Sequence, residues 1–522
     1  MRLIDFFDQA AVAQPERRAF VDPAVTYTYA AMRSFSQRLA VAMLEHGLTD
    51  LGRVAVYSPN SATAFGCVLA TLRAGGVWVP INIRNVVEHN AEFMTLCECE
   101  WLFYHSSCRD NVETLRPQVP TLQRLICIDQ NDGLTPGIDE ILAGTEGRVP
   151  EELQHDPHRM VTMFGSGGTT GRSKAVRWDN LTWETLVAQA TPNMRPAPLA
   201  GPPVHLCVAP MTHAAGVIAI MMLPLAPTNV IPESTDPLTI MRAIAEHRVT
   251  HLYLPPTVLY ALLAHPRVRE FDYSSLTHFI IGAAPVSPDK LAEAVEVFGP
   301  CMCQYYGQAE APMVAMFLSP SDVTDAVQNP AHRQRLLSCG RPNSLTRAAI
   351  MDDDGSLLPT GSRGELVLEG NLVAPCYYRN PQATAAAHQN GWLRTGDVAH
   401  IDADGFVYIV DRKKDMIITG GFNVFSVEVE AVINGHNAVE NCAVIGVPDP
   451  KWGEAVKAII MLRPEATVSE REIIELCKAK LGSVKSPKSV EFWPDLPRTA
   501  VGKIQKKEIR ARFWANTQRA VN

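Results

Sequence analysis

Nine consecutive residues, Ser166 to Lys174, combine the residue types that hold a phosphate group. They read Ser-Gly-Gly-Thr-Thr-Gly-Arg-Ser-Lys. Glycines let the backbone turn its N–H groups toward an anion, hydroxyls add donors, and the terminal lysine adds positive charge. The run is not a P-loop, because Arg172 and Ser173 separate Gly171 from Lys174. It predicts a phosphate site, and the alternative is an ordinary polar surface loop.

The segments around this run alternate between strand and helix signals. The apolar stretch 160–164 leads directly into it and is typical of a buried strand, which is where α/β proteins carry phosphate sites. The same signals predict strands at 53–57, 77–81, 250–254 and 279–281, and helices at 62–73, 257–263 and 288–298. This alternation indicates βαβ units with parallel sheets.

The pattern changes near Arg347. Short strands separated by turns are predicted at 348–351, 365–368 and 405–410, which indicates a small β subdomain. The charged cluster 411–415, Asp-Arg-Lys-Lys-Asp, then precedes another α/β segment. A chain of 522 residues is too long for one core, and we place a domain boundary in this cluster. The sequence therefore predicts an α/β protein with two domains. Residues 1–413 form a large domain of two parallel-sheet subdomains and the β subdomain, and residues 414–522 form a small α/β domain.

Composition excludes several classes of protein. With 47% hydrophobic and 20% charged residues the chain is typical of a globular enzyme, and its formal charge of −8 argues against a nucleic-acid-binding protein. No apolar run approaches the roughly 20 residues of a transmembrane helix. Asp5 and Asp8 interrupt the first apolar residues, so no signal peptide is indicated. We expect a cytoplasmic protein.

The cysteines and histidines show no metal-site spacing. Of twelve cysteines, only Cys97 with Cys99 and Cys301 with Cys303 lie close together, as Cys-x-Cys rather than Cys-x-x-Cys. The fifteen histidines show no His-Glu-x-x-His pattern. We expect reduced structural thiols and no protein-held transition metal.

A second cluster, residues 304–310, reads Gln-Tyr-Tyr-Gly-Gln-Ala-Glu. An aromatic ring can stack on a purine, a glycine permits close approach, and a carboxylate can bind the magnesium that accompanies a nucleoside triphosphate. The alternative is a strand end with core tyrosines.

Two further clusters lie toward the C-terminus. Residues 391–397, Gly-Trp-Leu-Arg-Thr-Gly-Asp, place one carboxylate in an expected turn, where it could accept ribose hydroxyls or cap a helix. Residues 497–504, Pro-Arg-Thr-Ala-Val-Gly-Lys-Ile, contain one lysine that, taken alone, is typical of a solvated surface charge.

In this order, these motifs resemble the adenylate-forming superfamily of acyl-CoA synthetases, nonribosomal adenylation domains and luciferases. The motifs are the phosphate run, Tyr-Gly-x-x-Glu, Thr-Gly-Asp, Asp-Arg-Lys-Lys-Asp with a following Gly-Gly, and the final Gly-Lys. The resemblance covers essentially the whole chain. It is strongest to the AMP-forming acid–CoA ligases of the fatty-acid and aryl-acid type.

The chain departs from the family pattern at two positions. Ser173 stands where the family usually carries proline or an aliphatic residue. Ala309 replaces the threonine of Tyr-Gly-x-Thr-Glu, whose hydroxyl contacts the α-phosphate in relatives. Loss of one such hydrogen bond costs on the order of 1 kcal/mol, which lowers activity without abolishing it.

The resemblance implies a two-step reaction. A carboxylate is a poor acyl donor because its leaving group would be oxide. The substrate carboxylate therefore attacks the α-phosphate of ATP to give an acyl-adenylate and pyrophosphate, and the thiol of coenzyme A then displaces AMP. No covalent enzyme intermediate is needed, so the protein positions the reactants and neutralises charge.

The resemblance also assigns roles to residues. Glu310 would hold Mg²⁺, and Lys503 would neutralise charge between the attacking carboxylate and the α-phosphate. Lys414 matches the hinge about which a mobile C-terminal domain rotates between the two steps. The residues implied to contact the β- and γ-phosphates are Ser166, Gly167, Gly168, Thr169, Thr170, Gly171 and Lys174. Those implied to surround adenine, ribose and the pantetheine of coenzyme A are Gly282, Ala283, Ala284, Tyr306, Gly307, Gln308, Asp397, Arg412, Gly420 and Gly421.

The segment 210–216, Pro-Met-Thr-His-Ala-Ala-Gly, matches the family's acyl-site motif. The match implies that His213 lies near the substrate carboxylate, and the alternative is a buried structural histidine. Amino-acid-activating relatives carry an amine-pairing aspartate in this region and this chain does not, which favours an amine-free acid. Small or apolar residues predict a roomy hydrophobic pocket lined by Ala214, Ala215, Tyr305 and Met313.

Two other functions remain open. A carrier-protein loader would transfer the acyl group to a separate phosphopantetheine arm, since only 19 residues follow Lys503 and no carrier domain is expected there. A nucleotide-binding regulator without turnover has Ala309 as its only support. The expected partners are a small carboxylic acid, ATP and coenzyme A, with no nucleic acid. The sequence identifies neither the acid nor the oligomeric state, and a homodimer is left open.

Overall fold

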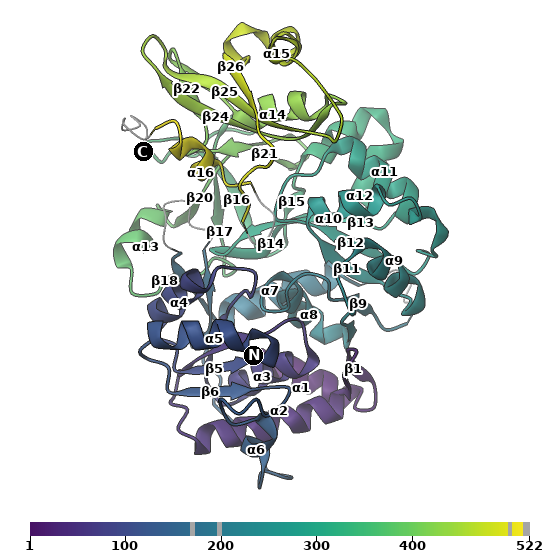
Figure 1. Ribbon diagram of the computed structural model, residues 1–522, viewed down its shortest axis with the longest axis vertical. Coiled ribbons are helices and arrows are strands. Elements are labelled where there is room, and N and C mark those ends of the chain that lie inside the picture. Colours follow the sequence, from purple (N-terminus) through teal and green to yellow (C-terminus); the bar gives the residue numbers. More distant parts are fainter. Residues whose placement is uncertain (167–172, 196–200, 500–503, 515–522) are drawn as a thin grey trace. The chain divides into compact units, whose positions relative to one another are not determined.

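The computed structural model describes residues 1–166, 173–195, 201–499 and 504–514. The chain divides into two compact units. Unit 1 comprises Met1–Arg347 and Leu368–Leu393, and unit 2 comprises Ala348–Val367 and Arg394–Asn522. Figure 1 shows the elements of both units. The domain boundary between residues 413 and 414 stays a prediction.

Unit 1 contains a seven-stranded sheet that carries the phosphate run. Its order is β18 (Cys376–Tyr377), β8 (Ala175–Asp179), β7 (Met160–Gly165), β4 (Val77–Pro80), β3 (Arg53–Tyr57), β5 (Trp101–Tyr104), β6 (Arg124–Cys127). The strands from β7 to β6 are parallel, whereas β8 and β18 add antiparallel pairs at one edge. The predicted strands at 53–57, 77–81 and 160–164 are therefore confirmed.

Unit 1 also contains a second sheet, which has nine strands. Its order is β15 (Arg341–Pro342), β14 (Ala311–Leu318), β13 (Met302–Gln308), β12 (His278–Ile281), β11 (His251–Leu254), β9 (Val204–Leu206), β10 (Thr228–Val230), β1 (Arg18–Val21), β2 (Thr26–Thr28). The strands from β13 to β1 are parallel, and β2, β14 and β15 pair antiparallel at the edges.

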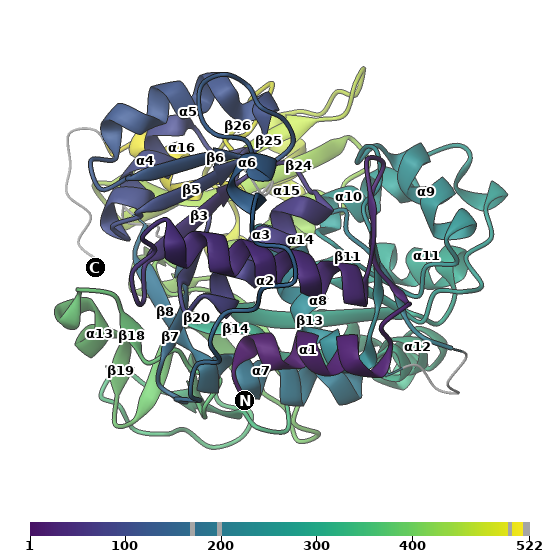
Figure 2. The same ribbon diagram turned by 90° about the horizontal axis from the view of Figure 1, so that it is seen from below.

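Helices cover both faces of these sheets. Figure 2 shows α4 and α5 on one side of β5 and β6, and α2 and α3 on the other. Successive side chains of each strand point to opposite faces of the sheet, so both faces have side chains that pack against helices. The helices of unit 1 are α1 (Leu3–Ala13), α2 (Tyr29–Glu45), α3 (Ala62–Arg73), α4 (Val87–Leu96), α5 (Arg109–Leu115), α6 (Ile138–Leu142), α7 (Asn180–Asn193), α8 (Ala214–Met221), α9 (Pro237–Glu246), α10 (Pro256–Leu263), α11 (Pro288–Phe298), α12 (Pro320–Gln328) and α13 (Pro381–Ala387).

A smaller sheet follows, as the change of pattern near Arg347 predicts. It has the order β16 (Arg347–Met351), β17 (Gly364–Glu369), β20 (Trp392–Ile401), β19 (His388–Gln389), with β21 (Val407–Arg412) beside β20. The last of the predicted strands, 405–410, begins later than expected. Gly405 has φ 83° and its N–H donates to the Asp402 carbonyl, so these residues form the turn before β21.

Unit 2 continues with its own sheet and helices. Its strands have the order β23 (Phe422–Val424), β22 (Ile417–Thr419), β25 (Gly453–Leu462), β24 (Val439–Asp449), and β26 (Ser489–Phe492) pairs with β25. Helices α14 (Ser426–Asn434) and α15 (Glu470–Lys485) pack on one face, and α16 (Lys506–Ala511) packs on the other. The predicted class, a large α/β domain with parallel sheets followed by a smaller α/β domain, is confirmed.

All twelve cysteines are free thiols, as expected. Burial raises the pKa of the Cys301 thiol to about 12 and that of Cys127 to about 11, so both stay protonated. No helix among the described residues is both long and apolar enough to cross a membrane.

Candidate active site

The phosphate run lies between two strands and is closed at its base. Gly165, the last residue of β7, pairs antiparallel with Ala175, the first of β8. Ser166 N donates to the Lys174 carbonyl at 2.8 Å, and Lys174 N donates to Ser166 Oγ at 3.2 Å. The two ends of the run are thereby fixed together. The remaining predicted phosphate ligands lie outside the described residues: Gly167, Gly168, Thr169, Thr170 and Gly171.

The Tyr-Gly-x-x-Glu motif forms the connection between β13 and β14. The ladder shifts register between Tyr306 and Gln308, which is a bulge at Gly307. A Cβ atom on Gly307 would lie 2.5 Å from the Met313 backbone nitrogen, so no larger residue fits. The glycine thus lets the two strands approach, and Glu310 lies in the turn directly before β14.

Tyr377 contacts two of the residues that are predicted to bind phosphate and Mg²⁺. Its hydroxyl donates to Glu310 Oε1 at 2.7 Å, and the Lys174 ammonium lies 4.6 Å from the centre of its ring. Burial raises the pKa of Tyr377, and the Glu310 carboxylate raises it further, so the phenol remains a neutral donor. One side chain therefore contacts both the expected phosphate-binding lysine and the expected magnesium ligand. Sequence reasoning missed it, because a tyrosine on a two-residue strand carries no chemical pattern of its own.

A second link joins the same motif to the acyl-site segment. Trp178 Nε1 donates to the Ala309 carbonyl at 2.7 Å. The Trp178 ring stacks on Phe164 with 4.0 Å between ring centres, and Phe164 lies 6.0 Å from the His213 ring. The strand before the phosphate run therefore packs beside both predicted motifs.

His213 lies at the start of α8 and its side chain is exposed. Neighbouring protein atoms nevertheless desolvate the ring and lower its pKa, so its role near the substrate carboxylate stays a prediction. The backbone turn before the helix is tight, because a Cβ atom on Gly216 would lie 1.8 Å from the Met211 carbonyl oxygen. Ala214 is half-buried and Ala215 is buried.

The predicted adenine turn follows β12. Ala283 has φ 67°, a left-handed conformation, and Ala283 and Ala284 are accessible. A Cβ atom on Gly282 would lie 3.2 Å from the Tyr305 carbonyl oxygen, which brings this turn beside β13. Tyr306 on that strand is half-buried.

Tyr305 and Met313 are the other predicted pocket residues. Tyr305 is buried, and its ring stacks on Phe317 at 4.9 Å between centres. Its hydroxyl is buried with no hydrogen-bond partner among the described residues. Met313 is half-buried with φ 54°. That the pair lines an acyl pocket stays a prediction.

In unit 2, the two predicted ribose ligands contact each other. Asp397 on β20 faces Arg412 on β21 in the ladder, and Arg412 Nε lies 2.6 Å from Asp397 Oδ1. The Asp397 side chain is 3% exposed and that of Arg412 is 37% exposed, so the pair has one open side. Asp397 lies inside a strand. The expectation of a turn is wrong, and so is the alternative of a helix cap.

Gly420 and Gly421 form a two-residue hairpin between β22 and β23. Thr419 pairs with Phe422, and the glycines have φ 57° and 83°. Two consecutive positive φ values are typical of a type I′ turn, which favours glycine at both positions. Gly420 N also donates to the Trp452 carbonyl at 2.8 Å.

Lys414 lies in the turn between β21 and β22, where a hinge residue is expected. Lys503 lies outside the described residues. No cluster of three or more metal-ligating side chains occurs among the residues that the structure describes. Mg²⁺ is commonly held by one or two carboxylates together with substrate phosphates, and Glu310 fits that donor set.

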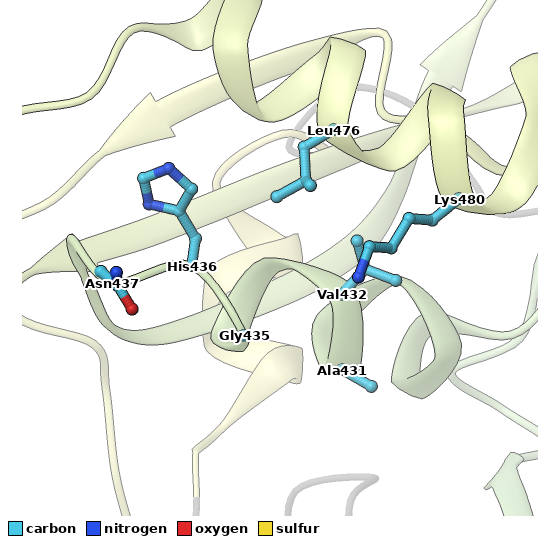
Figure 3. A pocket seen from close by; sticks show the side chains of 7 residues that line it. All are labelled: Ala431, Val432, Gly435, His436, Asn437, Leu476 and Lys480. Carbon is cyan, nitrogen blue, oxygen red and sulfur yellow. The ribbon is translucent and has the colours of Figure 1, made fainter.

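A cavity of about 470 Å³ lies in unit 2 between α14 and α15. Figure 3 shows His436 and Asn437 on one side of it and Leu476 and Lys480 from α15 on the other. None of the predicted site residues lines it.

Comparisons with known proteins agree with this arrangement. Residues 7–378 match the family model of the AMP-binding enzymes, and residues 428–503 match that of the AMP-binding enzyme C-terminal domain. The chain is 38% identical over 418 residues to a medium/long-chain-fatty-acid–CoA ligase of Mycobacterium tuberculosis, covering 78% of this chain and 71% of that protein. It is 32% identical over 522 residues to feruloyl-CoA synthase of an Amycolatopsis species, covering 97% and 99%.

Among solved structures, the amide bond synthetase of Marinactinospora thermotolerans superposes with a TM-score of 0.87. The identity is 29%, and the match covers 98% of this chain and 100% of that chain. The predicted resemblance is confirmed, and the chain belongs to the AMP-binding enzyme family of the adenylate-forming superfamily.

Proposed function

We propose that this protein is an AMP-forming acid–CoA ligase that activates a hydrophobic, amine-free carboxylic acid. Its substrates are the acid, ATP and coenzyme A, and its products are acyl-CoA, AMP and pyrophosphate. The fatty-acid and feruloyl ligases among its relatives support an acid–thiol ligation.

One observation carries the proposal. Tyr377 contacts the ammonium of Lys174 through its ring and the carboxylate of Glu310 through its hydroxyl. A cation for phosphate and a carboxylate for Mg²⁺ are both needed to hold a nucleoside triphosphate. Because the buried Tyr377 side chain contacts both groups, we infer a site that is preorganised for ATP and not an ordinary surface loop.

In the first step, a carboxylate oxygen of the acid attacks the α-phosphorus of ATP. The bond from that phosphorus to the bridging oxygen breaks, and pyrophosphate leaves with both electrons. Lys174 and the run that it ends hold the outer phosphates, while Glu310 holds Mg²⁺, which when bound neutralises phosphate charge. Lys503 stabilises the charge that develops between the carboxylate and the α-phosphate.

Asp397 and Arg412 position the nucleotide through its ribose. A carboxylate accepts hydrogen bonds from vicinal hydroxyls, and the paired guanidinium orients that carboxylate. Tyr306 stacks on adenine beside the Gly282–Pro285 turn.

In the second step, the thiol of coenzyme A loses its proton and attacks the acyl carbonyl. The bond to the adenylate oxygen breaks and AMP leaves. A rotation about Lys414 separates the two steps, and the hairpin of Gly420 and Gly421 contacts the pantetheine arm.

The exposed ring of His213 and the small residues after it support a pocket for an uncharged acyl group. Release of pyrophosphate tests the proposal on a panel of short, medium, long-chain, aryl and amino acids. Acid-dependent release with hydrophobic acids is expected. Release that is equal or greater with free amino acids would contradict the substrate class, and no release with any acid would favour a regulator without turnover.

The acceptor is tested in the same assay. Coenzyme A, a phosphopantetheinylated carrier protein and a primary amine are supplied in parallel to the enzyme with its best acid. The amine is included because the superposable Marinactinospora protein is an amide bond synthetase. We expect thioester formation with coenzyme A to exceed that with either other acceptor.

A further inference from the structure

Unit 2 contains a cluster of charged side chains that the proposed reaction does not use. Its centre is Lys506, the first residue of α16, whose side chain is only 15% exposed. The Lys506 ammonium lies 2.7 Å from Glu430 Oε1 and donates to Ser426 Oγ at 2.7 Å. Both partners belong to α14, so one cation ties these two helices together.

The same cluster reaches the end of strand β21. Asp411 is 2% exposed and accepts hydrogen bonds from the Ser426 backbone N–H and, at 2.8 Å, from its hydroxyl. Asp411 Oδ1 also accepts the Arg412 backbone N–H at 2.7 Å. Ser426 therefore stands between the Lys506 ammonium and the residue that precedes a proposed ribose ligand.

Electrostatics hold the lysine in its charged form. Burial opposes that charge, but the carboxylates of Glu430, Asp411 and Asp415 outweigh it and raise the pKa of Lys506. Burial raises the pKa of Glu430 and of Asp411, and the lysine counters part of that shift. The charged form of Lys506 and the charged forms of the carboxylates thus stabilise one another.

A second contact lies one helical turn further along α16. Arg510 Nη2 lies 2.5 Å from Asp415 Oδ1, and Arg510 Nη1 donates to the Lys414 carbonyl at 3.5 Å. Residues four apart project from the same side of a helix. Lys506 and Arg510 therefore fix one face of α16 to both ends of the segment 411–415, which contains the proposed hinge.

The chain before α16 is also anchored. Gln505 N donates to the Pro497 carbonyl at 2.8 Å, and Arg498 forms an antiparallel bridge with Ile504. These contacts join described residues on either side of positions 500–503, and Lys503 lies three positions before Lys506 in the sequence.

A cluster of this kind is not needed for stability alone. Replacement of a buried ion pair by apolar side chains of similar volume is often neutral or stabilising, because desolvation of the charges offsets their attraction. The charged contacts instead specify how α16 packs. The ammonium and the guanidinium fix this helix in one register against residues 411–415.

We propose that Lys506 is a positioning residue, which fixes α16 in register with the hinge segment 411–415. Lys503 precedes Lys506 by three positions in the sequence, so the register of α16 sets where the chain that carries this cation begins. This inference rests on the proposed function, since Lys503 is the cation assigned to the first step. Loss of the Lys506 charge would leave thioester formation nearly intact, because that step does not use Lys503.

The test compares Lys506→Met with Lys507→Met, the same substitution at the neighbouring exposed lysine. Adenylation is measured as acid-dependent pyrophosphate release, and thioester formation is measured from supplied acyl-adenylate and coenzyme A. We expect Lys506→Met to lower adenylation at least about 30-fold and thioester formation less than about threefold, with Lys507→Met unchanged in both. Equal losses in the two half-reactions, or no loss, would overturn the inference.

Hydrogen exchange gives a readout that does not depend on the reaction. Peptides from 506–511 and from 411–415 should both exchange about tenfold faster in Lys506→Met than in Lys507→Met. If wild type releases no pyrophosphate, the proposed function fails and the exchange measurement still decides whether the two segments are coupled. Faster exchange in α16 alone would contradict the coupling.

Lys506→Met leaves two carboxylates without their cation, so its folding is checked by thermal unfolding. Glu430→Gln is the second variant, because it keeps the lysine and the side-chain volume and removes one charge. It should lower adenylation in the same direction, by about three- to tenfold, with thioester formation unchanged. A Glu430→Gln enzyme with wild-type adenylation and wild-type exchange would also overturn the inference.

Discussion

The Tyr377 hydroxyl donates a hydrogen bond of 2.7 Å to Glu310 Oε1, across 67 positions of the sequence. The contact arises because β18 adds to the edge of the seven-stranded sheet beside β8, which follows the phosphate run. The Ala374 N–H also donates to the Glu310 carbonyl at 2.8 Å. Both ends of Glu310 are therefore held by one segment, which fixes the direction of its carboxylate.

Tyr377→Phe removes this hydrogen bond and keeps the ring beneath the Lys174 ammonium. A hydrogen bond to a charged group contributes about 1.5–3 kcal/mol, so we expect kcat/KM for ATP in the adenylation step to fall about tenfold or more. Pyrophosphate release as a function of Mg²⁺ concentration should show a higher Mg²⁺ requirement. Tyr378→Phe is the matched control, since its hydroxyl bonds to Glu98 instead. Equal kinetics in the two variants would contradict the role of Tyr377.

Asp397→Asn tests the proposed ribose site. The substitution keeps the shape of the side chain and removes the charge that pairs with Arg412. We expect KM for ATP to rise at least about tenfold, because a neutral amide both weakens the hydroxyl contacts and releases the guanidinium. Asp404→Asn, in the turn of the same hairpin, is the control. Unchanged ATP binding by calorimetry in Asp397→Asn would mean that the ribose lies elsewhere.

Local patterns predicted the elements well. Strand 53–57 and helices 62–73 and 288–298 are confirmed at both ends. The helices have clear start signals, since the Ser61 side chain caps one and Pro288 is the first residue of the other. Motifs that are contiguous in sequence also predicted the candidate site residues, because a glycine-rich turn or a Gly-Gly hairpin carries its own geometry.

Contacts between distant segments could not be predicted in this way. Tyr377 meets Glu310 only because an edge strand of two residues joins the sheet, and periodicity cannot detect so short an element. Asp397 was expected in a turn because glycines flank its motif, yet Gly396 adopts φ 71° within β20. The pairing of β20 with β21 determines which residues surround Asp397. A local sequence pattern does not predict which strands pair, so these surroundings could not be predicted.

A row of three buried histidines predicts acid sensitivity. His205, His251 and His278 are direct neighbours on β9, β11 and β12, and the rings of the last two stack at 4.6 Å. Burial lowers the pKa of His205 and of His278 to about 4, and lowers that of His251 as well. The row is therefore neutral in the folded protein at neutral pH.

Below the ordinary histidine pKa of about 6.5 the unfolded chain binds more protons than the folded one. The contribution of these neutral histidines to the free energy of unfolding is fully present above pH 6.5, and it is lost as the pH falls toward about 4. For His205 and His278, this effect should lower the free energy of unfolding by about 2 kcal/mol each between pH 7 and pH 5. His278→Gln should reduce this loss by that amount in denaturant unfolding, and His155→Gln at an exposed site should not. Equal pH dependence in both variants would contradict the prediction.

Lys503→Ala should nearly stop adenylation. A preorganised donor at developing charge typically contributes about 100- to 1,000-fold to the rate. Thioester formation from supplied acyl-adenylate should stay close to normal, because the proposed second step does not use this cation. Lys507→Ala, four positions along, is the control. Equal loss in both half-reactions would show that Lys503 has another role.

Gly420→Ala tests the hairpin that we assign to the pantetheine arm. Gly420 has φ 57°, and a Cβ atom there would lie 2.6 Å from the Trp452 ring. Gly421 has φ 83° with no atom within 4 Å of such a Cβ. Alanine at either position strains the backbone by roughly 1–2 kcal/mol, and only the first also displaces the indole.

We therefore expect Gly420→Ala to slow thioester formation more than Gly421→Ala, with adenylation little changed in both. Half-reaction rates on the two variants measure this difference. A double variant with Trp452→Ala separates the two causes, because removal of the indole should return the Gly420→Ala penalty to that of Gly421→Ala. If the penalty persists without the indole, backbone strain alone explains it. If adenylation falls as far as thioester formation, the hairpin does not act in the second step.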